Sequence, residues 1–205
     1  MADGRFTTRD VVGLASFSAL AGVVFAAWSQ LAVLIVYPLL GHLGTASIYG
    51  LWFMGGTLPA YVIRKRWVAF AGETVASVVE LLLVSPYSVL LYYYGPAQGI
   101  MSELAFALGR YKRWGWGTMA LAGALPVIAA YPFDCLVSPF YPACRTYPLW
   151  LHLSIVSAMI ISGVLLSGLL VKSVVDRLVE AGSMRGWAVA EARAVQAEAG
   201  RRGRA

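Results

Sequence analysis

Three glutamates and one glutamine fall inside strongly apolar stretches of this sequence, where such side chains are costly. Glu73 and Glu80 are seven residues apart, so they share one face of a helix, and Gln98 and Glu103 follow in the next apolar stretch. No Lys, Arg or His lies at a matching depth. Each carboxyl group must therefore be protonated, hydrated in a cavity, or paired with a group from outside the chain. A cationic ligand would meet that need.

Tyrosine and tryptophan are frequent near the end of the apolar stretches where Glu80 lies. Most would anchor the chain at the membrane interface, but a few that face inward beside a carboxylate would bind a flat cationic ring. The candidate pocket residues are Glu80 and Gln98 first, then Glu103, Tyr94, Trp52, Tyr87 and His152. Glu80 and Gln98 could instead bond to a neighbouring helix, and this alternative applies more strongly to Glu73 and Glu103. Asp134 could touch the ligand or a gate, and we expect His42 to be solvated in the first external loop.

Signatures of catalysis are nearly absent from the chain. It contains no GxxxxGK[ST], HExxH or GxSxG, so nothing indicates a nucleotide site, a catalytic zinc or an activated serine. The segment GWGTMA at 115–120 matches the dinucleotide pattern by letters alone, because it opens an apolar helix and follows no strand. Acidic groups without a nucleophile or metal ligands define no reaction, so we expect no enzyme activity, cofactor or metal site.

The composition indicates which elements must carry these residues. Of the 205 residues 60% are hydrophobic and 13% charged, and the mean hydropathy is +0.71, well outside the range of soluble domains. The sequence therefore predicts an all-α membrane protein. Six stretches are long and apolar enough to span a bilayer: 10–30, 46–63, 67–85, 88–109, 115–132 and 149–172.

The distribution of Lys and Arg predicts the orientation. Six spans place both ends of the chain on one side, and 15 of the 16 basic residues then fall on that side, leaving only Arg145 on the other. By the positive-inside rule both termini are expected in the cytoplasm. The net charge of +6 therefore reflects topology, and no folded soluble domain offers a basic face to nucleic acid.

The chain divides into two predicted parts, a six-helix domain over 1–175 and a charged cytoplasmic tail over 176–205. The tail sequence from 176 to 199 predicts a short charged helix, a Gly-Ser break and a second helix rich in Ala, Glu and Arg. Such a segment could lie on the anionic inner leaflet or dock a cytoplasmic partner.

Two further features of the sequence each leave two interpretations open. Cys135 and Cys144 fall in the expected external loop, where disulfides persist, so we expect a bond between them, with two free thiols as the alternative. In the first span, Ala15 and Ala19 begin a stripe of small residues continued by Gly22 and Ala26. The stripe could dock a separate membrane subunit or pack inside the chain's own bundle.

Three segments resemble the YkoE-type S components of energy-coupling-factor (ECF) transporters, which belong to the ABC importers. They are YGLWFMGGTLPAYVIRK (49–65), ETVASVVELLL (73–83) and SPYSVLLYYYGPAQGIMSELAFALGRYKRW (85–114). The similarity covers the second to fifth spans, and the G-x-x-QG-x-x-x-E element is its most specific part.

This resemblance implies a six-helix, outward-opening subunit of a prokaryotic cell membrane that captures thiamine or its hydroxymethylpyrimidine precursor. It also implies a transmembrane coupling subunit, which Ala15 and Ala19 would contact, and two cytoplasmic ATPases. A different function stays open, a proton-coupled secondary transporter of a small cationic or heterocyclic solute with Glu73, Glu80 and Glu103 as a relay.

Overall fold

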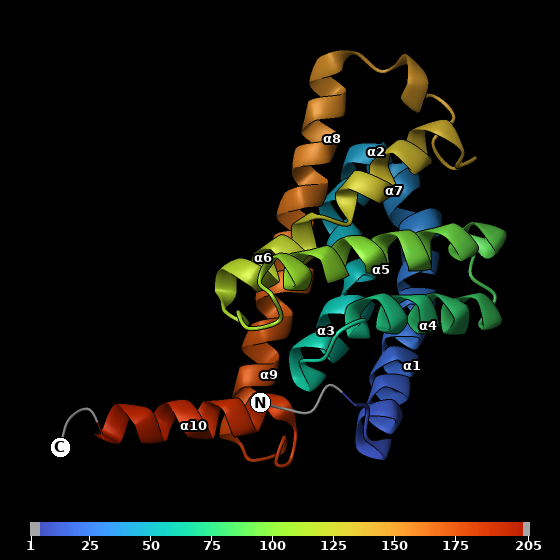
Figure 1. Ribbon diagram of the computed structural model, residues 1–205. Coiled ribbons are helices and arrows are strands. Elements are labelled where there is room, and N and C mark those ends of the chain that lie inside the picture. Colours follow the sequence, from blue (N-terminus) through green and yellow to red (C-terminus); the bar gives the residue numbers. More distant parts are fainter. Residues whose placement is uncertain (1–4, 203–205) are drawn as a thin grey trace.

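The computed structural model describes residues 5–202, and within that range every regular element is a helix (Figure 1). The α-helices are α1 (Thr8–Leu31), α2 (Tyr37–Ile48), α3 (Met54–Ile63), α4 (Val68–Leu82), α5 (Leu91–Leu108), α6 (Trp116–Ala124), α7 (Val127–Leu136), α8 (Leu149–Ser162), α9 (Val171–Glu180) and α10 (Ala188–Arg202). The wider π-helical segments are η1 (Ala32–Val36) and η5 (Gly163–Leu170), and the 3-10 segments are η2 (Tyr49–Phe53), η3 (Ser88–Leu90) and η4 (Cys144–Thr146).

All six predicted spans are helical, which confirms the all-α prediction. In the part of the chain that the structure describes, three helical stretches are long and apolar enough to cross a membrane: Thr8–Ile63, Trp116–Leu136 and Leu149–Glu180. The first is 56 residues long and contains two of the predicted spans. The other two predicted spans correspond to α4, with 15 residues, and α5, with 18. The placement of the termini in the cytoplasm stays a prediction.

The expectation that a loop joins the first two spans was wrong, while its position outside the membrane stays a prediction. Residues 32–48 form η1 and α2, because the apolar run AVLIVYPLL extends the helix well beyond the length of α1. The chain changes direction at Gly41, whose φ of 64° lies in the left-handed region that glycine adopts without strain. His42 is therefore buried, with its ring stacked on Tyr141 at 3.8 Å between centroids, and is not solvated.

Close helix packing depends on small residues. α4 and α5 lie side by side, and α4 also packs against α1 (Figure 1). A Cβ atom on Gly95 would lie 2.6 Å from the Ser77 hydroxyl oxygen, and one on Gly99 would lie 2.9 Å from the Phe70 carbonyl oxygen. The backbone of α5 can therefore approach α4 only because both positions are glycine.

The tail folds back onto the transmembrane helices. α9 continues η5 to Glu180, so the predicted boundary at 175/176 falls inside a helix, and the division into two domains stays a prediction. A turn follows, and the Trp187 ring packs against Gly13 and Phe17 of α1 before α10 begins. In Figure 1 α10 runs across the end of α9 at a large angle.

Candidate functional site

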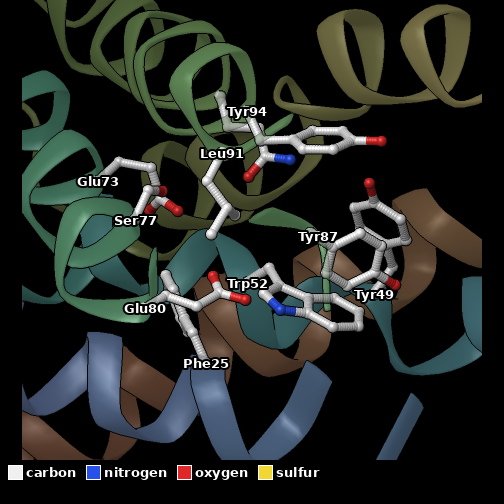
Figure 2. A pocket seen from close by; sticks show the side chains of 10 residues that line it. Phe25, Tyr49, Trp52, Glu73, Ser77, Glu80, Tyr87, Leu91 and Tyr94 are labelled. Atoms are coloured by element: carbon white, nitrogen blue, oxygen red, sulfur yellow. The ribbon is translucent and has the colours of Figure 1, made fainter. Parts of the chain in front are cut away.

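A small cavity lies where α1, η2, α4 and α5 meet (Figure 2). The empty space between its walls is about 320 Å³, with the open mouth included. Polar groups come from α4 and α5, and aromatic rings cover most of the remaining wall. The lining residues are Phe25, Tyr49, Trp52, Glu73, Ser77, Glu80, Tyr87, Leu91, Tyr94 and Gln98.

Glu80 has only part of its hydrogen-bonding capacity used by the protein. The hydroxyl groups of Ser29 and Ser85 donate to its Oε1 at 2.5 and 2.8 Å, and Trp52 Nε1 donates to Ser29 Oγ at 3.0 Å. Within residues 5–202 nothing donates to Oε2, and Figure 2 shows the carboxyl group directed toward the Trp52 side of the cavity. One oxygen therefore holds the side chain in place while the other is available to a ligand.

Glu73 lies about two turns before Glu80 on the same face of α4, and it also lines the cavity. The backbone N–H of Gly56 donates to its Oε2 at 2.5 Å, while its buried Oε1 has no partner among the described residues. The ion pairs of the described chain are Lys65–Asp10, Lys172–Asp176 and Arg193–Glu180. None of them involves a cavity carboxyl group, so both acids face the cavity without a cation.

The aromatic wall is built from rings in edge contact. Trp52 meets Tyr49 at 5.2 Å and Tyr87 at 5.8 Å between ring centroids, and Tyr87 meets Tyr94 at 6.2 Å. The Tyr94 hydroxyl donates to the buried Asp134 carboxyl group, which fixes the position of the ring from behind. This arrangement can bind a flat cationic ring through cation–π attraction, with Glu80 as its counter-charge.

The segment that joins α7 to α8 packs against this wall. Its Phe140 ring lies 4.8 Å from the Tyr87 ring, and Tyr141 is buried against His42. Cys135 and Cys144 are joined in a disulfide that closes the segment, with their Cα atoms 4.9 Å apart. The aromatic wall thus continues into a connection that is cross-linked by a disulfide.

His152 does not reach the cavity. Its Nδ1 is hydrogen-bonded to the Tyr131 hydroxyl, beside the disulfide. Although His152 and the two sulfur atoms lie within 4.8 Å of one another, the sulfurs are bonded to each other and offer no thiolate to a metal ion. The expectation that His152 joins the rim of the pocket has no support in this geometry.

Glu103, also predicted as a pocket residue, lies instead at the N-terminus of α4. Its carboxylate accepts hydrogen bonds from the backbone N–H groups of Trp67 at 2.6 Å, Ala69 at 2.9 Å and Phe70 at 3.2 Å, and from the Tyr111 hydroxyl at 2.7 Å. Burial and the neighbouring Glu103 raise the pKa of Tyr111, which keeps this donor protonated. Glu103 thus supplies the cap that the N-cap residue Trp67 cannot provide.

The structure therefore brings together most of the predicted pocket. Glu80, Gln98, Tyr94, Trp52 and Tyr87 all line the cavity, and Glu73, which we favoured less, lines it as well. Ser77 could have been found from the sequence, because it shares the α4 face of Glu73 and Glu80. Phe25 and Ser29 carry no such signal, since contacts between distant segments bring them to the site.

The small-residue stripe of α1 is divided between two environments. Ala15 is exposed and Ala19 is half-buried on the outer side of α1. Gly22 is buried, and a Cβ atom there would lie 2.5 Å from the Ala76 carbonyl oxygen of α4. The stripe therefore packs internally at Gly22 and is open at Ala15.

Comparisons with known proteins agree with this architecture. Residues 9–129 match a family described as the permease component of an ABC-type cobalt transport system. The putative HMP/thiamine permease protein YkoE of Bacillus subtilis (strain 168) is 30% identical over 167 residues, which cover 76% of this chain and 81% of that protein. A crystal structure of an S component of an ECF transporter superposes with a TM-score of 0.88 at 27% identity, over 97% of this chain and 98% of that one.

The helical membrane fold with its aromatic-lined cavity is that of a membrane transport protein. The chain belongs to the S components of ECF transporters, which confirms the family indicated by the sequence motifs. Proteins of this family are substrate-binding subunits of transporters and not enzymes.

Proposed function

We propose that this chain captures thiamine or its hydroxymethylpyrimidine precursor for an ECF-type importer of a prokaryotic cell membrane. The observation that carries the proposal is the aromatic cavity whose two glutamates have no cationic partner among the described residues. Thiamine supplies the missing positive charge in its thiazolium ring. The name of the B. subtilis relative, a putative HMP/thiamine permease, supports the same substrates.

The cavity offers a complementary group for each part of thiamine. The free oxygen of Glu80 is the counter-charge for the thiazolium, and the edges and faces of Trp52 and Tyr87 surround the ring. Gln98, further along the α5 wall, can both donate to and accept from an aminopyrimidine edge. Hydroxymethylpyrimidine would use only the second part of the site.

Transport requires partners that this chain does not encode. We expect a transmembrane coupling subunit that contacts the exposed part of the α1 stripe at Ala15 and Ala19, together with two cytoplasmic ATPases. The absence of a nucleotide-binding motif in the sequence is consistent with ATP hydrolysis in separate subunits. In this arrangement both termini lie in the cytoplasm.

A proton relay through three glutamates has less support. The Glu103 carboxylate accepts hydrogen bonds from four donors at the N-terminus of α4. It lies away from the cavity that Glu73 and Glu80 line. A proton-coupled transporter would lose one member of its relay.

Calorimetry on the purified protein tests the substrate directly. Thiamine and hydroxymethylpyrimidine should each bind at a single site, while riboflavin, a larger neutral ring system, should not bind. If correctly folded protein binds neither thiamine nor hydroxymethylpyrimidine, the vitamin assignment fails while the family assignment stands.

A further inference from the structure

A second, much larger hollow lies at the opposite end of the molecule from the aromatic wall. This basic groove is bounded by the ends of α3, α6 and α9 and by α10, and its free space is about 1790 Å³, including the part open to solvent. Figure 1 shows α10 running outward below α6. The side of α10 that lines the groove is mixed: Ala188, Val189, Ala192 and Val195 stand beside the polar residues Glu191, Arg193 and Gln196.

The groove carries more positive than negative charge. Its basic residues are Arg64, Lys65, Lys112, Lys172 and Arg193, against the acidic residues Asp176 and Glu191. Lys65, Lys172 and Arg193 form ion pairs with acidic side chains of the chain. Arg64 and Lys112 form none among the described residues, so two cations remain available to an anion from outside.

Arg64 is held in place for such a contact. It ends α3 in the left-handed conformation, with φ at 55°, where glycine is the usual residue. Its Nε donates to the Tyr61 carbonyl oxygen at 3.2 Å, and its guanidinium lies 4.9 Å from the Tyr61 ring and 5.6 Å from the Trp114 ring. Within residues 5–202 the other guanidinium nitrogens have no hydrogen-bond partner, and a planar guanidinium is well suited to a phosphate group.

We propose that the basic groove binds the headgroup of an anionic phospholipid, with Arg64 and Lys112 contacting its phosphate. Trp114 and Trp116 line the same groove, at the ends of apolar helices, and Trp116 is exposed, as expected of tryptophans at a membrane interface. The apolar side chains of α10 would contact the start of the acyl chains, and the basic residues would select the anionic headgroup.

A lipid explains the groove better than an acidic protein segment does. Half of its wall is apolar or aromatic, and two tryptophans, Trp114 and Trp116, lie among these residues. An acidic peptide would use the two cations but would leave Val189, Val195 and Trp116 unmatched. The proposal is independent of the substrate of the aromatic cavity.

Native mass spectrometry on the full-length protein tests this site. Protein in detergent is equilibrated with equal amounts of phosphatidylglycerol and phosphatidylcholine, and the bound lipids are counted. The wild type should retain phosphatidylglycerol preferentially. In Arg64→Gln/Lys112→Gln the preference should fall by about tenfold or more, since each basic residue near an anionic lipid contributes about fivefold.

The matched control is Arg113→Gln/Arg177→Gln, which removes the same charge from exposed residues of the same end that do not line the groove. It should keep the preference. Because Arg64 also packs on aromatic rings, Lys112→Gln alone serves as a second variant and should lose about fivefold. An equal loss in the control, or no preference in the wild type, would overturn the proposal, and binding of an oligoglutamate peptide in place of phosphatidylglycerol would identify a protein segment as the occupant.

Discussion

The α4–α5 pair buries glutamates in two regions, and the two regions differ in how many hydrogen-bond donors surround the carboxyl groups. At the basic end Glu103 accepts from three backbone N–H groups and one phenol. At the cavity end Glu80 accepts from two serines on one oxygen only, and Glu73 has a buried oxygen without a partner among the described residues. All three look alike in the sequence.

The difference lies in which donors the fold supplies. A carboxylate whose oxygens accept hydrogen bonds from backbone donors stabilises the fold, because removing the carboxylate would leave several N–H groups without an acceptor. A carboxylate with a free oxygen beside a cavity is available to a ligand. The number of donors already present therefore separates a structural acid from a binding acid, and the following experiments test that rule.

The largest effect should come from Glu103→Ala. It leaves the N-terminal N–H groups of α4 without their acceptor, so the free energy of unfolding should fall by about 3 kcal/mol. Denaturation in mixed micelles, followed by circular dichroism, measures it. Glu103→Gln keeps one acceptor oxygen and should lose less. Protein that remains folded should bind thiamine as the wild type does, and weakened binding with unchanged stability would reverse the assignment.

Glu80→Gln should act on binding instead. It keeps the shape of the side chain and removes its charge, so the affinity for thiamine should fall by about 1.5 to 3 kcal/mol, roughly ten- to a hundredfold. Hydroxymethylpyrimidine is neutral and should lose much less. Calorimetry with both ligands decides the matter: equal thiamine binding by the variant would leave the substrate class standing but remove Glu80 as its charge partner.

Gln98→Ala should have a smaller and less selective effect. The loss of a hydrogen bond to the aminopyrimidine edge should weaken both ligands by about 1 kcal/mol, roughly fivefold. The ratio of the two losses is the informative measurement, because it should be near one for Gln98 and far from one for Glu80. A loss confined to thiamine would place Gln98 beside the thiazolium.

Ala15→Trp should leave ligand binding unchanged. Ala15 is exposed on α1 and does not line the cavity. A bulky side chain there should prevent the close approach of another helix. Uptake and co-purification with the coupling subunit should be lost. Gly22→Ala is the contrasting variant, since its Cβ atom would meet the Ala76 carbonyl oxygen, and it should lower stability. Loss of ligand binding in Ala15→Trp would mean that this position supports the bundle itself.

Much of the architecture was predictable from short-range patterns. Apolar runs of the length of a bilayer indicated each span, and the charge of Glu80 inside such a run indicated a pocket residue on α4. Glu73 shares that helix face, but we expected it to bond to a neighbouring helix. The helical connection over 32–48 was missed. When an apolar run continues past one span, its composition does not show whether the helix continues with a bend or ends in a loop. His42 was misplaced for the same reason.

By itself the sequence determined the membrane class, the positions of the six spans, the acids on the α4 face and the family, because each depends on residue type and local spacing. Only the tertiary structure decided which acids line the cavity and which one caps a helix. It also brought Ser29 to Glu80, 51 residues away in sequence, and Glu103 to the start of α4. The physical reason is that the free energy of a buried carboxylate depends on the donors around it, and those donors come from segments that only folding places together.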